Sequence, residues 1–238
     1  MVTQIALGDI LVDVVKKDIK NIHLSVYPPT GKVRISAPAR LDNDTIRVFA
    51  LSRLGWIKRQ QKKLCAQERE TPRDYVDRES HYVWGKRYLL KVIEKDAAPE
   101  ITLTPRRMQL QVRPETDRRK KQEILEAWYR ETLKVAIAPL IARWEPVLDV
   151  KVERFLVRRM KTKWGSCSPG SGHIRLNTDL AKKPPECLEY ILVHEMAHLL
   201  EPTHNARFIA LMDRFMPRWQ FYRAELNRLP VRHETWIY

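Results

Sequence analysis

Apolar and polar positions alternate through the first forty residues. Between Ile5 and Pro38 the chain contains three β-rich runs, ILVDVV, IHLSVY and KVRISA, and a Pro-Pro-Thr-Gly turn separates the last two. This pattern predicts a small hairpin or meander. The next segment, 41–64, begins with Asp and Asn residues suited to a helix N-cap and then repeats apolar positions at helical spacing, which predicts one helix.

The periodicity changes twice more before the middle of the chain. A second β-rich set reads YVWGKRYLLKVIE, EITLTP and MQLQVRP, with Gly, Pro and charged residues between the runs. From Arg118 to Trp144 the apolar positions return at helical spacing, which predicts a long helix. Pro139 lies inside this segment, where a proline kinks or divides a helix.

The last part of the chain predicts two strands and three helices. The strands are KVERFLVRRM and GHIRLNTDL, on either side of the turn-rich loop KTKWGSCSPGS. Pro184 and Pro185 then open an apolar helix, which is expected to end near Leu200 or Glu201 because Pro202 follows. Two short amphipathic helices are expected over 205–215 and 218–229, and no internal repeat is recognisable in the sequence.

Composition narrows the class of protein. The chain of 238 residues carries 44 Lys and Arg against 29 Asp and Glu, a formal charge of +15, which favours polyanions or acidic surfaces as partners. Its three cysteines are widely spaced, which argues against a disulfide framework and favours a reducing cytoplasm. The N-terminus has no signal-peptide pattern and no run approaches about 18 apolar residues, so a soluble protein is expected.

The apolar helix carries polar residues that its surroundings do not explain. His194 and His198 are four residues apart and therefore share one helix face, and Glu195 projects beside them. In this H-E-x-x-H arrangement two imidazoles bind zinc and the glutamate activates a water. Burying these groups without partners would cost several kcal/mol, and a divalent cation would compensate them.

A hydrolytic zinc site needs a third protein ligand. The candidates are Glu201, His204, Asp213 and Glu225. Pro202 disfavours a helical conformation at Glu201, so the chain is expected to turn and to return His204 to the metal. Asp213 and Glu225 remain the alternatives.

The same region resembles a known family. The motifs KTKWGSC, RLN, VHEMAHL and HNARF occur in the order found in the YgjP-like family of predicted metal-dependent hydrolases, from about Arg154 to Asn227. The hairpin and the GWIKRQ segment are similar to that family's N-terminal region. This chain has THN where many relatives have NH, a departure that keeps the spacing to Phe208.

The resemblance implies an α+β fold related to the SprT and WLM metalloproteases. A zincin-like metallopeptidase domain would occupy residues 118–238, after an N-terminal β-rich region with one helix over residues 1–117. The alternative is that the two regions form one continuous domain. The family pattern assigns the zinc ligands and the general base to residues that the spacing also indicates: His194, His198 and His204 as ligands and Glu195 as base.

Residues that contact substrate are less well defined. In zincin sheets an edge strand runs antiparallel to the substrate beside the metal helix, and the resemblance suggests GHIRLNTDL for that place. The alternative is a structural strand whose Asn177 hydrogen-bonds the metal helix. Gly165 is interpreted as a backbone kink and Cys167 as a small buried thiol, with a nucleophilic Cys167 as the lesser alternative. The candidate substrate contacts are Trp164, Arg175, Asn177 and Tyr222.

Three functions fit these observations. The leading one is a zinc metallopeptidase with one zinc ion per chain and a polypeptide substrate, and the donor to its oxyanion would be Tyr190, Tyr222, His173 or Arg207. The second is a nucleoside triphosphate phosphohydrolase, favoured by the basic residues Arg158, Arg159, Lys161, Lys163 and Arg175. The third is a DNA-associated protease or binding module that uses the basic charge with Trp56, Trp84 and Tyr88.

Overall fold

The computed structural model describes residues 2–27, 30–66, 70–160 and 163–230. The chain forms two compact units. One comprises the described residues up to Thr71 together with Pro230, and the other comprises Pro72–Leu229. The division lies near Thr71 and not at residue 117, because the second β-rich set shares a core with the helices that follow it. None of the described helices combines the length and the apolarity that a membrane span requires.

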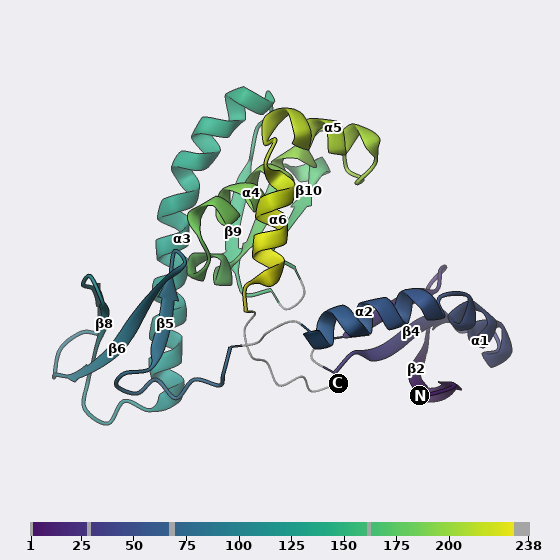
Figure 1. Ribbon diagram of the computed structural model, residues 1–238, viewed down its shortest axis with the longest axis horizontal. Helices are drawn as coiled ribbons and strands as arrows, with labels where there is room; N and C mark the ends of the chain where they lie inside the picture. The colour runs from purple at the N-terminus through teal and green to yellow at the C-terminus, as the bar shows by residue number, and fades with distance from the viewer. Residues whose placement is uncertain (1, 28–29, 67–69, 161–162, 231–238) are drawn as a thin grey trace. The chain divides into compact units, whose positions relative to one another are not determined.

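The N-terminal unit is a four-stranded sheet with two helices on one face (Figure 1). The sheet has the order β1-β2-β4-β3 and consists of β1 (Val2–Leu7), β2 (Ile10–Lys17), β3 (His23–Tyr27) and β4 (Lys32–Pro38). β1–β2 and β3–β4 are antiparallel hairpins, and β2 pairs with β4 in parallel. The sheet is therefore two hairpins joined by a parallel pair and not a meander, since periodicity identifies strands without specifying their partners.

Two helices replace the single helix expected over 41–64. α1 (Asn43–Ser52) and α2 (Leu54–Ala66) are interrupted at Arg53. The Ser52 hydroxyl donates to the Phe49 carbonyl oxygen at 2.7 Å, a local hydrogen bond that competes with the helical pattern at the break. Both helices bury apolar side chains against the sheet.

The second unit begins with the same arrangement. Its first sheet has the order β5-β6-β8-β7, again two antiparallel hairpins joined by a parallel pair. The strands are β5 (Ser80–Val83), β6 (Lys86–Glu94), β7 (Glu100–Leu103) and β8 (Arg107–Val112). A glycine with positive φ turns the first hairpin of each sheet, Gly8 at 66° and Gly85 at 76°, and an aspartate caps the helix that follows, Asp42 and Asp117. The chain thus repeats a hairpin–hairpin–helix order that its sequence does not reveal.

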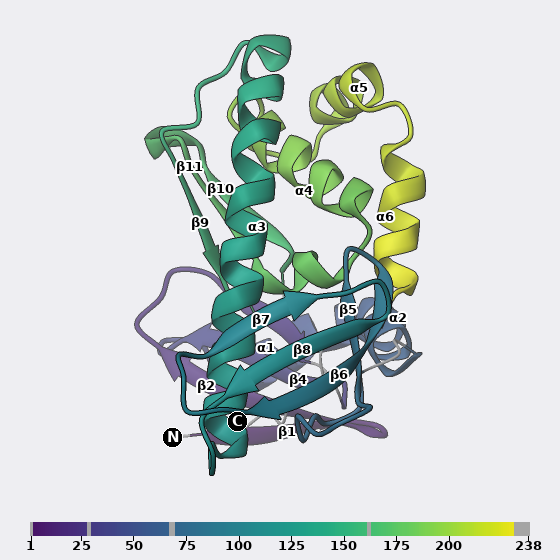
Figure 2. The ribbon, with the colours of Figure 1, turned by 90° about the vertical axis from the view of Figure 1, so that its left-hand side faces the viewer.

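Helix α3 (Arg118–Leu148) extends along the second unit (Figure 2). Pro139 and Pro146 lie inside this helix without ending it. A continuous row of buried side chains fixes both halves of the helix against the core, and consists of Leu125, Tyr129, Leu133, Ile137, Ile141 and Leu148. The β5–β8 sheet lies against the N-terminal half of α3 and α4 beside its C-terminal half (Figure 2).

A three-stranded sheet supports the remaining helices. Its order is β10-β11-β9, so that β11 (His173–Asn177) is central, antiparallel to β10 (Gly165–Ser168) and parallel to β9 (Arg154–Arg158). GHIRLNTDL is therefore not the edge strand, because both sides of β11 are already paired. Among the described strands, the edge beside the apolar helix is β10. Five further described elements complete the unit: η1 (Pro169–Ser171), η2 (Thr178–Lys182), α4 (Pro185–Ala197), α5 (Ala206–Phe215) and α6 (Trp219–Arg228).

Candidate metal centre

Helix α4 and its C-cap position carry the first two histidines, His194 and His198. The helix opens at Pro185 with Pro184 at the N-cap position, as expected from the sequence. Its apolar side chains are buried, between α3 on one side and α6 on the other (Figure 2). His194 and His198 therefore project from a helix inside the unit, and His198 is only 9% exposed.

The chain turns directly after α4. The regular helix ends at Ala197, and its last backbone hydrogen bond runs from the Glu201 N–H to the Ala197 carbonyl oxygen at 3.0 Å. Pro202 follows and cannot continue the pattern. The Glu201 carboxylate accepts from the Thr203 hydroxyl at 3.0 Å, so it stabilises the turn.

Helix α5 begins where this turn ends. The Asn205 side chain accepts from the Phe208 N–H at 3.0 Å, which is an N-cap interaction. The capped turn returns His204 to the end of α4, where its Nε2 lies 3.0 Å from Nε2 of His194.

The three histidines converge on one point. Their ligand nitrogens all lie within 4.8 Å of one another. A zinc ion that holds nitrogen ligands at about 2.0–2.1 Å in a tetrahedron keeps them about 3.3 Å apart. The distance of 3.0 Å between the Nε2 atoms of His194 and His204 is close to this spacing, so the group could hold one ion. Nδ1 of His198 lies 3.0 Å from the Glu201 carbonyl oxygen, which can only accept. The neutral tautomer that donates this hydrogen bond presents an unprotonated Nε2, the form of the nitrogen that binds a metal.

Burial favours the neutral form of His194 and His204. It lowers the pKa of His194 to about 3, and the neighbouring His198 and His204 act in the same direction. Burial and the charge of His198 also lower the pKa of His204. Phe208 closes one side of the group, with its ring stacked on that of His198 at a centroid distance of 4.6 Å. Neutral imidazole is the form that binds a metal ion.

Glu195 is the carboxylate beside these rings. It is 5% exposed, and burial raises its pKa to about 7, while the charge of Lys163 and a hydrogen bond from the Cys167 N–H act in the opposite direction. Because Cys167 belongs to β10, the carboxylate lies between α4 and the edge strand. A carboxyl group with a pKa near neutrality is suited to accept and donate protons.

Comparison with known proteins agrees with this geometry. The family described as YgjP-like, metallopeptidase domain, matches residues 20–229. This chain belongs to the YgjP-like metallopeptidase family. No curated protein matches the chain.

Two solved structures are similar to part of the YgjP-like protein. One is the metallopeptidase zymogen of Pyrococcus abyssi abylysin, with 24% identity, a TM-score of 0.35, and coverage of 39% of this chain and 97% of its own. The other is the metallopeptidase zymogen of Methanocaldococcus jannaschii jannalysin, with 20% identity, a TM-score of 0.34, and coverage of 38% and 92%. Each is matched over nearly its whole length by less than half of this chain.

The alternative third ligands of the YgjP-like protein are engaged elsewhere. Asp213 Oδ1 accepts from Trp219 Nε1 at 2.7 Å, and Glu225 Oε1 accepts from Arg228 Nη2 at 2.7 Å. In the part of the chain that the structure describes, the side chains whose ligand atoms converge are His194, His198 and His204.

The predicted substrate contacts on the three-stranded sheet have different surroundings. Trp164 is half-buried directly before β10, with the Lys183 ammonium 5.8 Å from its ring centroid. Arg175 pairs with Ser166, one position from Leu176, and therefore projects from the face of the sheet opposite to α4. The structure thus separates Arg175 from the histidines.

Asn177 is the most buried of the predicted contacts. It is 5% exposed, and its amide nitrogen donates to the carbonyl oxygens of Met160 and Lys163 at 2.8 and 2.9 Å. Its oxygen accepts from the Asp179 N–H at 3.2 Å. These bonds go to the segment before β10 and to η2, so Asn177 fixes the approach to the edge strand and does not hydrogen-bond α4.

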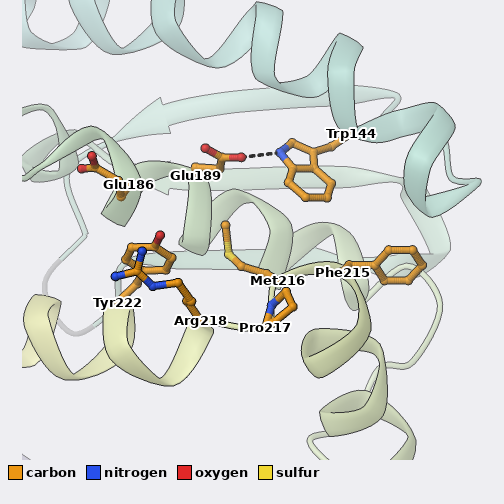
Figure 3. A pocket seen from close by; sticks show the side chains of 8 residues that line it. All are labelled: Trp144, Glu186, Glu189, Phe215, Met216, Pro217, Arg218 and Tyr222. Carbon is orange, nitrogen blue, oxygen red and sulfur yellow. Dashed lines mark hydrogen bonds between the residues drawn. The ribbon is translucent and has the colours of Figure 1, made fainter.

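Tyr222 lines a cavity of about 230 Å³ (Figure 3). Glu186 and Glu189, from the first turns of α4, line the same cavity, and Glu189 accepts from Trp144 Nε1 at 2.9 Å. The Arg218 guanidinium lies 5.6 Å from the Tyr222 ring centroid. Tyr222 therefore faces the beginning of α4, whereas the histidines lie at its end.

Three residues near the candidate metal centre affect it in ways that the sequence did not predict. Cys167 contributes its backbone N–H, and burial followed by the charge of Glu195 raises the pKa of its thiol to about 11, which argues against a nucleophile. The charge of Arg223, on α6, lowers the pKa of both His194 and His204. Gly165 makes close approach possible, as described below, and its position inside a strand was the available signal.

Proposed function

We propose that this YgjP-like protein is a zinc-dependent peptidase. The observation that carries the proposal is the convergence of three histidine nitrogens beside a buried carboxylate, supported by membership of a metallopeptidase family. His194, His198 and His204 would hold one zinc ion per chain. When bound, zinc supplies a Lewis acid that activates water and polarises the scissile carbonyl group.

Glu195 would move the proton. Its carboxylate would accept a proton from the attacking water, hold it, and donate it to the nitrogen of the leaving amine. Burial between α4 and β10 supports this role, because a carboxyl group in such a place has few competing water contacts.

Strand β10 would bind the polypeptide substrate. The Asn177 N–H donates to the Trp164 carbonyl oxygen at 2.9 Å, so the backbone of Trp164 is hydrogen-bonded to β11. In an antiparallel pair these bonds alternate along the strand, and the backbone N–H and C=O groups of Gly165 and Cys167 therefore point away from β11. An extended substrate would add to this edge as an antiparallel strand, with the half-buried Trp164 as a side-chain contact. The Cys167 N–H donates to the Glu195 carboxylate. A substrate bound along β10 would therefore have its scissile bond beside the base.

A cytoplasmic location is part of the proposal. In the described residues, Cys65, Cys167 and Cys187 form no disulfide bond. Cysteines without disulfide bonds are typical of proteins that work in a reducing compartment.

Removal and return of the metal test this function. The full-length protein, treated with a chelator and then dialysed, is assayed on a labelled unfolded polypeptide and on nucleoside triphosphates, before and after addition of one equivalent of zinc. We expect zinc to restore polypeptide cleavage and to leave the triphosphates intact. Zinc-dependent release of phosphate or pyrophosphate without polypeptide cleavage would favour the phosphohydrolase and contradict the peptidase.

A further inference from the structure

Gly165 lies against the side chain of Glu195. A Cβ atom added at Gly165 would lie 2.6 Å from Oε1, 2.7 Å from Cγ and 2.9 Å from Cδ of Glu195. These distances are shorter than side-chain contacts that proteins tolerate without movement. Any other residue at position 165 must therefore displace either the strand or the carboxylate.

Position 165 requires a glycine because there is no space for a side chain, and not because of its backbone conformation. Gly165 does not have a positive φ; the described glycines that do are Gly8, Gly31, Gly85 and Gly172. It lies in strand β10 opposite Leu176, whose side chain is fully buried in the core, and so the missing side chain would have pointed at α4. A residue with a side chain could adopt this backbone but would collide with the helix.

The same strand makes a second contact with the carboxylate. Cys167, two residues along β10, donates its backbone N–H to Glu195. Gly165 and Cys167 are alternate residues of β10, so their equivalent atoms point in the same directions. Gly165 leaves the space that Glu195 occupies, and Cys167 provides the hydrogen-bond donor. Because Glu195 is 5% exposed, the side chain has little room to move elsewhere.

We propose that Gly165 is a positioning residue: its missing side chain allows β10 to hold the Glu195 carboxylate in the place where it serves as general base. The inference rests on the proposed peptidase function for its catalytic consequence. The contact itself does not depend on that function and is tested separately.

Thermal unfolding of the metal-free full-length protein tests the contact. Four proteins are compared: the wild type, Gly165→Ala, Glu195→Ala and the double variant. Since overpacking destabilises a core, we expect Gly165→Ala alone to lower the Tm by roughly 5 °C, and by less than half as much when Glu195 is already alanine. An equal decrease in both backgrounds would overturn the proposal.

A folding failure is also informative. If Gly165→Ala does not fold but the double variant does, the proposal is supported, because removal of Glu195 has relieved the collision. If neither folds, the methyl group meets something other than Glu195 and the proposal is wrong. Gly170→Ala is the matched control, since nothing lies within 4 Å of a Cβ added there.

Polypeptide cleavage tests the catalytic consequence. With zinc content equal to that of the wild type, we expect Gly165→Ala to lower kcat about 100-fold, with KM changed by less than about threefold, and Gly170→Ala to change neither. An unchanged kcat for Gly165→Ala would contradict the positioning role. A wild type without cleavage would instead refute the proposed function, while the unfolding experiment still decides the contact.

Discussion

At the scale of single residues, Pro202 determines which side chain completes the histidine group. The spacing in the sequence would place Glu201 on the same helix face as His198. In the structure, however, the last helical hydrogen bond is donated by the Glu201 N–H, and the Glu201 carboxylate accepts from the Thr203 hydroxyl. The chain then turns, and His204 reaches His194. Helical spacing and proline chemistry are local properties, so this part of the site could be predicted from the sequence.

The first prediction concerns His204. We expect His204→Ala to weaken zinc binding at least about 100-fold, because one of three converging nitrogens is lost and partners of metal ligands alone are worth 10–100-fold. Competition with a chromophoric chelator measures the affinity. Asp213→Ala is the control and should bind zinc as the wild type does; a weaker affinity for this variant than for His204→Ala would reverse the assignment.

The second prediction concerns thiol reactivity. Burial raises the pKa of Cys187 to about 11, with the charges of Glu225 and Glu186 adding to the effect, so its thiolate becomes abundant only as the pH approaches that value. In native protein at neutral pH, iodoacetamide should modify the exposed Cys65 first and Cys187 last. Mass spectrometry of time points follows the order, and rapid loss of the Cys187 thiol would contradict the described burial.

Contacts across the chain explain what could not be predicted at this scale. The sequence suggested a kink at Gly165, whereas the structure shows a close approach to Glu195, thirty residues later. Likewise, the charge of Arg223 acts on His194 from another helix. No local pattern encodes either relation.

At the scale of elements, strands and helices were predicted better than their partners. Most strands were found from their alternation, and the opening of α4 at its paired prolines was confirmed. β1 was not predicted, and β10 lies in the segment that was expected to be a turn-rich loop. The parallel pairs β2–β4 and β6–β8 and the central place of β11 were not foreseen. Strand pairing depends on residues far apart in the chain, and a repeated topology can persist after the side chains have diverged.

The third prediction concerns the approach to the edge strand. Asn177→Ala removes two part-buried hydrogen bonds to backbone carbonyl groups, which should cost about 2–4 kcal/mol and lower the Tm by roughly 5–15 °C. Thermal unfolding measures the change. Asn227→Ala, at an exposed position of α6, should change the Tm by no more than about 2 °C. Equal effects of the two substitutions would show that Asn177 does not hold this segment.

At the scale of the whole molecule, the chain divides within the polar segment 66–80 and not at the beginning of the long helix. The unit with the histidines begins at Pro72 and includes the second β-rich set, so its core combines strands and helices from most of the chain. Across this core the Tyr129 hydroxyl donates to the backbone carbonyl oxygen of Tyr82 at 2.9 Å. The α+β class followed from periodicity, but the division follows from packing.

The fourth prediction concerns stability in acid. His81 is 4% exposed, and burial followed by the charges of Arg73 and Lys182 lowers its pKa to about 4, although Glu79 acts in the opposite direction. Between about pH 6.5 and 4 the unfolded chain therefore binds more protons at this site than the folded chain, and stability falls as the pH falls through that window. The contribution is up to roughly 3 kcal/mol.

Urea unfolding of the metal-free protein at pH 7 and pH 4.5 measures this contribution. His81→Gln should lose less stability between the two pH values than the wild type does, whatever its stability at pH 7. The other buried histidines titrate equally in both proteins and cancel in the comparison. A variant with the same pH dependence as the wild type would show that His81 is protonated alike in the folded and unfolded chain.

The most direct test of the proposed peptidase compares the wild type with Glu195→Gln. Both full-length proteins are loaded with zinc, checked for equal zinc content, and assayed for the initial rate of cleavage of a labelled unfolded polypeptide. Loss of the base should lower kcat by roughly 10²–10⁴-fold while zinc stays bound, since the amide cannot accept the proton. Full zinc content with an unchanged rate in Glu195→Gln would contradict the mechanism.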